Sequence, residues 1–124
     1  DMLRVPGRAG SLADARADGA PVEVMYSPAE VAQRARESEG PVVFFATGFE
    51  TTAVATAAVL RHAPPENFLV LSAHKYVPPA MEAVAQMPDT AVAGFLAAGH
   101  AATITGYGLF EPFVERYRLP VVVG

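Results

Sequence analysis

Short apolar runs alternate along the chain with longer stretches in which apolar residues recur at helical spacing. The apolar runs are typical of strands and lie at 22–26, 42–46, 68–72, 93–97 and 121–123. The helical patterns lie at 28–38, 51–62, 79–87 and 109–117, with a short extra helix expected near 11–17. This alternation predicts an α/β fold in which the strands are parallel.

The strand runs are apolar throughout, as in V-V-F-F at 42–45 and V-V-V at 121–123. Continuous runs indicate strands that are buried on both faces, whereas half-exposed strands alternate between apolar and polar residues. Right-handed crossovers then place helices on both sides of the sheet. We therefore expect a three-layer sandwich with a mostly parallel sheet of about five strands and helices on both faces.

Helix starts are marked by capping residues. S-P-A-E at 27–30 joins an N-cap serine to a proline and a glutamate in the first turn, which predicts a capping box, and S-L-A-D at 11–14 is a weaker version. The pair Pro78 and Pro79 marks another helix start.

A length of 124 residues fits one domain, with residues 1–20 as a lead-in segment and helix. The chain begins with Asp1 and ends directly after an apolar strand, which normally continues into a covering helix. We therefore expect a single α/β domain excised from a longer protein.

Composition narrows the function classes. Hydrophobic residues make up 52% and charged residues 18%, so the chain can bury a core. A net charge of −4 without a basic cluster disfavours nucleic-acid binding. The absence of cysteine excludes thiolate catalysis and cysteine-ligated metal within these residues, and it fits a reducing compartment. The longest apolar stretch is about half a membrane span, so no membrane association is expected.

Candidate chemistry gathers after the strands, where parallel sheets bind ligands. T-G-F-E-T-T at 47–52 combines a turn glycine, two hydroxyls and a carboxylate at a helix N-terminus, although helix capping alone also accounts for it. His74 and Lys75 follow the next strand, and His100 follows another; an exposed polar loop and a backbone-bonded histidine are the plainer readings. Ser72 and His74 also form a possible serine–histidine pair, but neighbours in sequence need not meet in space.

Four blocks of residues occur in order: D-M-L-R-V-P-G at 1–7, G-F-E-T-T at 48–52, S-A-H-K with V-P-P-A at 72–75 and 77–80, and G-F-L with G-H at 94–96 and 99–100. Together they closely resemble the HypD family of hydrogenase maturation proteins, and the resemblance runs over residues 1–124. G-F-E-T-T alone is weakly specific, whereas four ordered blocks are strongly specific.

The resemblance implies a role in assembling the iron centre of nickel–iron hydrogenases, an iron that carries cyanide and carbon monoxide. HypD-type proteins are scaffolds that work with a HypC-type chaperone and a HypE-type cyanide donor in the cytoplasm. They have two Rossmann-like α/β domains facing a cleft and a C-terminal part with an iron–sulfur cluster. This chain is similar to the second α/β domain, and the family's cysteines lie outside it. The resemblance therefore implies no cofactor within these residues.

The resemblance also implies a set of cleft residues, of which none is a certain catalytic residue or a metal ligand. They are Arg4, Gly48, Phe49, Glu50, Thr51, Thr52, His74, Lys75, Pro78, Pro79 and His100. The family pattern P-G-H-V-S stands here as A-G-H-A-A at 98–102. We hypothesise that Glu50, Thr51, Thr52, His74 and His100 offer protons or hydrogen bonds around the iron's ligands.

Two other functions stay open from the residues alone. One is a free-standing flavodoxin-like domain that binds an anion or small molecule, and the other is a hydrolase with His74 or His100 as base. On the scaffold hypothesis, the isolated domain has no activity of its own.

Overall fold

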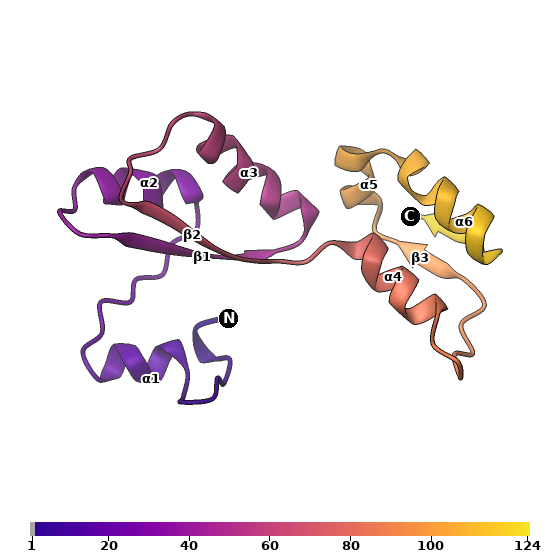
Figure 1. Ribbon diagram of the computed structural model, residues 1–124, viewed down its shortest axis with the longest axis horizontal. Helices are drawn as coiled ribbons and strands as arrows, with labels where there is room; N and C mark the ends of the chain where they lie inside the picture. The colour runs from indigo at the N-terminus through magenta and orange to yellow at the C-terminus, as the bar shows by residue number, and fades with distance from the viewer. Residues whose placement is uncertain (1) are drawn as a thin grey trace.

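The computed structural model of the protein describes residues 2–124 (Figure 1). Asp1, the first residue of the D-M-L-R-V-P-G block, lies outside the described residues. The elements follow in the order η1 (Met2–Arg4), α1 (Leu12–Ala17), α2 (Pro28–Arg36), β1 (Val42–Gly48), α3 (Glu50–Arg61), β2 (Phe68–His74), α4 (Val77–Ala85), β3 (Phe95–Ala97), α5 (Gly99–Thr105), η2 (Tyr107–Phe110), α6 (Glu111–Tyr117) and β4 (Val121–Val123).

The described strands form two separate parallel sheets of two strands each, β1 with β2 and β3 with β4. The α/β class and the parallel pairing are therefore confirmed, whereas the single sheet of about five strands is wrong. Residues 22–26 form no strand, and none of the described strands pairs with them. Glu23 accepts a hydrogen bond from Arg34 of α2 at 3.2 Å, and Met25 packs against the core.

The two sheets belong to two lobes, which Figure 1 shows side by side. The first lobe holds α2, β1, α3 and β2, and the second holds α4, β3, α5, η2, α6 and β4. The chain passes from one to the other between β2 and α4, and α3 contacts α5 where the lobes meet. The carboxyl ends of both sheets point toward this meeting region, which we call the waist.

Each lobe has its own core. In the first lobe, Val31, Ala32 and Ala35 of α2 pack on Phe68, which stacks on Phe44 with ring centroids 6.4 Å apart. In the second lobe, the buried residues come from α4, β3, α5, η2 and α6; they are Met81, Ala97, Ala102, Phe110 and Phe113.

Among residues 2–124, helices cover only one face of the β1–β2 sheet, so the expected three-layer sandwich is not confirmed. α2 and α3 cover the face of the β1–β2 sheet that carries Phe44 and Val70. On the opposite face Val43 and Leu71 are each 58% exposed. β1 and β2 do carry apolar side chains on both faces, but within residues 2–124 helices cover only one of these faces.

The helix caps are partly as predicted. At α1 the full capping box forms, with Asp14 accepting from the Ser11 N–H at 2.8 Å and the Asp14 N–H donating to Ser11 Oγ at 3.2 Å. At α2, Ser27 is the N-cap and its hydroxyl accepts from the Ala29 N–H.

Asn67, just before β2, holds the end of α2. Its Nδ2 donates to the carbonyls of Ala35, Ser38 and Gly40 at 2.8, 3.0 and 2.9 Å. One amide thereby links the last turn of α2 to the turn that follows it, and the Ala35 carbonyl also accepts from the Ser38 N–H. Within residues 2–124, no helix is both long and apolar enough to cross a bilayer.

Candidate functional site

Two of the predicted loops meet where β1 and β2 end. Gly48, the last residue of β1, pairs in register with His74, the last residue of β2. The Lys75 N–H then donates to the Gly48 carbonyl at 2.8 Å. Because the strands are parallel and in register, the chain leaves both of them at the same height. We call the group Gly48, Glu50, His74, Lys75 and Val77 the strand-end junction.

Gly48 lets β1 turn directly into α3. Its φ is +131°, and a Cβ at this position would lie 2.6 Å from Thr52 Oγ1. Only glycine avoids both the strain and the collision. Phe49 is the single residue between strand and helix, and Glu50 opens α3. The turn therefore fixes where Glu50 stands.

Glu50 caps a helix other than its own. Its Oε1 accepts a hydrogen bond of 2.7 Å from the N–H of Val77, the first residue of α4. Pro78 and Pro79 follow and have no N–H, so Val77 offers the one N–H of the first three helical residues. From the sequence, Glu50 is expected to favour the dipole of α3 or to bind a ligand, and its bond to α4 is not predicted. The proline pair is the sequence signal for such a bond, because it leaves a single backbone N–H in the first turn of α4 for a nearby carboxylate to accept.

Two buried polar atoms at the junction have no hydrogen-bond partner within residues 2–124, Oε2 of Glu50 and Nε2 of His74. Such atoms are uncommon in folded proteins, because an unpaired buried polar group is costly. The other oxygen of Glu50 is held by Val77, so the side chain is fixed. These two atoms are the places where the junction can still form hydrogen bonds.

Ser72 and His74 do meet in space. Ser72 Oγ lies 3.0 Å from His74 Nδ1, because residues two apart in a strand lie on the same face. No described carboxylate forms a hydrogen bond with Nε2, so the pair lacks the third member of a hydrolytic triad.

The first turn of α3 also faces the waist. Phe49 is its N-cap and forms no side-chain cap, so the N–H groups of this turn have no side-chain acceptor from the N-cap residue. Thr51 is half-buried and Thr52 exposed on the same turn. This helix end is electropositive and carries two hydroxyls.

The other predicted site residues lie in three places: beside the strand-end junction, on α5 and in η1. Lys75 and Pro79 are exposed next to the junction, and Pro78 is half-buried. His100 is exposed in the first turn of α5, the helix that contacts α3. Arg4 lies in η1, which packs against α1.

A second close backbone approach fixes α5. The Gly99 N–H donates to the Gly124 carbonyl at 2.7 Å, and a Cβ on Gly99 would lie 2.5 Å from that oxygen. The glycine of the A-G-H segment is thus required by the neighbouring end of β4.

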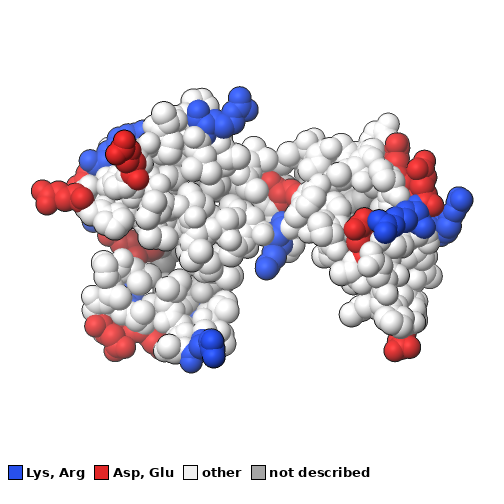
Figure 2. All heavy atoms as spheres, in the orientation of Figure 1, with Lys and Arg blue, Asp and Glu red and all other residues white. Residues whose placement is uncertain are grey.

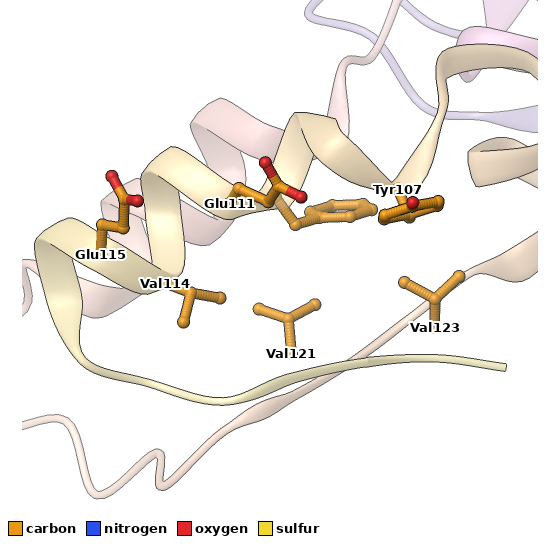
Figure 3. A pocket seen from close by; sticks show the side chains of 7 residues that line it. Tyr107, Glu111, Val114, Glu115, Val121 and Val123 are labelled. Atoms are coloured by element: carbon orange, nitrogen blue, oxygen red, sulfur yellow. The ribbon is translucent and has the colours of Figure 1, made fainter.

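A hollow lies elsewhere, between β4 and the segment formed by η2 and α6 (Figure 3). It measures about 310 Å³ and is lined by Tyr107, Phe110, Glu111, Val114, Glu115, Val121 and Val123. Figure 3 shows Val121 and Val123 of β4 across the hollow from Tyr107, with Glu111, Val114 and Glu115 on the helix α6. None of the predicted site residues lines it. Within residues 2–124, no group of three or more His, Asp or Glu side chains could hold a metal ion.

Comparison with known proteins gives a consistent result. The family model HypD, described as the hydrogenase formation hypA family, matches residues 1–124. The chain is 40% identical over 134 residues to hydrogenase maturation factor HypD of Azotobacter vinelandii, covering 99% of the chain and 35% of that protein. It is 36% identical over 127 residues to HypD of Escherichia coli, covering 99% of the chain and 34% of that protein. The chain thus spans about a third of the length of these curated relatives.

Proposed function

Because the chain belongs to the HypD family, we propose that it acts as part of a hydrogenase maturation factor, as one wall of the cleft in which the hydrogenase iron centre is assembled. In this proposal the iron with its cyanide and carbon monoxide ligands is the cargo. The scaffold works with a HypC-type chaperone and a HypE-type cyanide donor in the cytoplasm, and its iron–sulfur cluster lies outside these residues.

The chain's own side chains do not fit direct ligation of that iron. The sequence contains no cysteine, and the described residues contain no cluster of potential ligands. An iron that carries diatomic ligands favours soft thiolates. The role proposed for this chain is therefore to surround the cargo with hydrogen-bonding groups, and no activity is expected of the 124 residues alone.

The observation that carries the proposal is the pair of buried unpartnered atoms at the strand-end junction. When the Ser72 hydroxyl donates to His74 Nδ1, Nε2 carries the proton and becomes a donor. A cyanide nitrogen accepts hydrogen bonds, so the His74 ring suits it. Glu50 Oε2 is an acceptor and suits a thiol or ammonium group of the assembly partner.

The first turn of α3 adds to this surface. The Thr52 N–H already donates to the Phe49 carbonyl, so the groups that this turn offers are the hydroxyls of Thr51 and Thr52, at the positive end of a helix dipole. His100 lies on α5, which contacts α3. We propose that both helices face the same cargo.

The test is a chimera of Escherichia coli HypD in which the aligned segment is replaced by residues 1–124. It is expressed in a strain that lacks HypD, and hydrogenase activity is measured together with the amount of soluble chimera. We expect the chimera to restore activity. Thr51→Val and His74→Gln should each lower activity at least tenfold with the amount of soluble protein unchanged.

Thr105→Val is the matched control, since this exposed threonine at the end of α5 donates to the Ala101 carbonyl of its own helix and lies five residues from His100, on another face. It should leave activity unchanged. Full activity in the Thr51 and His74 variants would refute the assigned roles. Titration of the isolated chain with cyanide, ferrous iron and ATP separates the alternatives, because tight binding of any one by the chain alone favours a free-standing binding domain.

A further inference from the structure

The chain passes between the two lobes through a very short connection. Among residues 2–124, no buried residue belongs to both cores, and Figure 2 shows the molecule narrowing where the lobes meet. The Lys75 N–H donates to the Gly48 carbonyl at the end of β1, so Lys75 belongs to the first lobe. Val77 is the first residue of α4 and belongs to the second lobe. Tyr76 alone therefore connects them.

The contact between α3 and α5, where the lobes touch, contains no large buried side chain. The buried residues of these two helices are Thr56 and Ala102, both small. The larger apolar residues Val54 of α3 and Ile104 of α5 are 49% and 51% exposed. Units joined by a contact that is neither large nor hydrophobic are expected to move relative to each other. Packing between the lobes thus leaves their relative orientation free to change.

Glu50 supplies the hydrogen bond that spans the waist. Its Oε1 accepts from the Val77 N–H at 2.7 Å, and within residues 5–124 no other hydrogen bond joins the lobes. The bond ties the first residue of α3 to the first residue of α4. Oε2 of the same carboxylate is buried without a partner in this arrangement. A donor from outside the chain can therefore reach this oxygen only after the waist opens.

We propose that Tyr76 is a pivot between the lobes and that the bond between Glu50 and Val77 is a latch, whose release opens the waist and exposes the Glu50 carboxylate. Tyr76 has an extended backbone, with φ −116° and ψ 124°, and is 49% exposed, so its dihedral angles can change without breaking a core contact. Hinges in proteins are commonly a few residues of this kind at the ends of elements.

The latch couples the proposed site to the arrangement of the lobes. A cargo or partner group that donates to Glu50 Oε2 binds the open arrangement only, and such a ligand shifts the population toward that arrangement. This coupling rests on the proposed function, whereas the pivot and the latch depend on the structure alone.

Val77 provides the test, because proline at this position removes the N–H and changes little else. Proline is favoured at the first helical residue, and Tyr76 already has the backbone conformation that a residue before proline requires. The chain contains no cysteine, so exposed Ala57→Cys on α3 and Glu115→Cys on α6 carry the only spin labels. Pulsed electron paramagnetic resonance then gives the distribution of distances between the lobes. Val77→Pro should roughly double its width, because the loosely packed lobes then move.

Two controls separate pivoting from other effects. Val77→Ala keeps the N–H and should leave the distribution as in the parent. Labels at Ala83 of α4 and Glu115 of α6 lie within the second lobe, and their distribution should not change in Val77→Pro.

An unchanged distribution between the lobes in Val77→Pro would overturn the proposal. Equal widening within the second lobe would also overturn it, since α4 would then be unfolding and not turning as a unit. If Val77→Pro does not fold, Glu50→Ala removes the acceptor and decides by the same measurements. None of these readouts uses hydrogenase activity, so the latch can fail while the roles assigned to Thr51 and His74 stand, and the reverse.

Discussion

The hydrogen bond from Val77 to Glu50 gives the most direct test of how the two lobes are joined. Glu50 opens α3 in the first lobe, and Val77 opens α4 in the second. Replacing Glu50 with alanine removes the acceptor and leaves the Val77 N–H at the start of α4 without a partner. Because two prolines follow, no other N–H of the first three helical residues can share the loss.

The magnitude follows from the bond type. The bond is 2.7 Å long, part-buried and made to a carboxylate, and hydrogen bonds to charged groups contribute about 1.5–3 kcal/mol. The helix dipole favours a carboxylate here by a further ~0.3–1 kcal/mol. We expect Glu50→Ala to lower the free energy of unfolding by about 2–3 kcal/mol. Glu50→Gln keeps an acceptor oxygen and should cost roughly 1 kcal/mol.

Urea denaturation followed by circular dichroism measures the free energy, and amide exchange by NMR reports on the Val77 N–H itself. Its exchange should be slow in the wild type and in Glu50→Gln, and fast in Glu50→Ala. Glu115→Ala, an exposed change on α6, serves as the control and should stay within about 0.5 kcal/mol of the wild type. A Glu50→Ala chain within the same ~0.5 kcal/mol, with Val77 still protected, would refute the assignment.

This bond also sharpens the functional test. Glu50→Ala lowers the stability of the fold and removes the candidate site group at once, so a loss of activity in it has two explanations. Glu50→Gln largely keeps the hydrogen bond to Val77 and removes only the negative charge of the side chain. Loss of hydrogenase maturation in a stable Glu50→Gln chimera would therefore be assigned to the cargo or partner and not to the fold.

Three further predictions concern the elements around the junction. Gly48→Ala should lower the free energy of unfolding, measured by chemical denaturation, by about 1–3 kcal/mol, because it adds strain at positive φ and a close contact with Thr52. Gly106→Ala, also at positive φ but with open space around it, should lower it by less. Equal losses in the two variants would show that the contact with Thr52 contributes nothing. Asn67→Ala should lower the free energy of unfolding by about 1–3 kcal/mol, since it removes the donor shared by three carbonyls of α2 and the turn after it, and an unchanged denaturation midpoint would contradict this. The side chain and backbone N–H of Ser11 lower the pKa of Asp14, so the stability gained from this carboxylate is present above the ordinary pKa of aspartate and is lost as the pH falls through the lowered one. An NMR titration should show this pKa rising in Ser11→Ala, and an unshifted value would count against the capping box.

Much of the local structure followed from the sequence alone. Apolar runs located β1, β2, β3 and β4, and proline and serine positions located the starts of α1, α2 and α4. These features depend on residues close together in the chain, where periodicity and capping decide the outcome. The family was also accessible from the sequence, because its motifs lie in short blocks at fixed order.

Tertiary structure alone decided how the strands assemble. Residues 22–26 carry a strand-like composition, yet no described strand pairs with them, and a strand needs a partner for its backbone hydrogen bonds. Strand order depends on contacts between distant residues, and an apolar run specifies a face to be covered without specifying what covers it. The same reason hid the role of Glu50, since its partner Val77 is 27 residues away and is placed only when β1 and β2 pair in register.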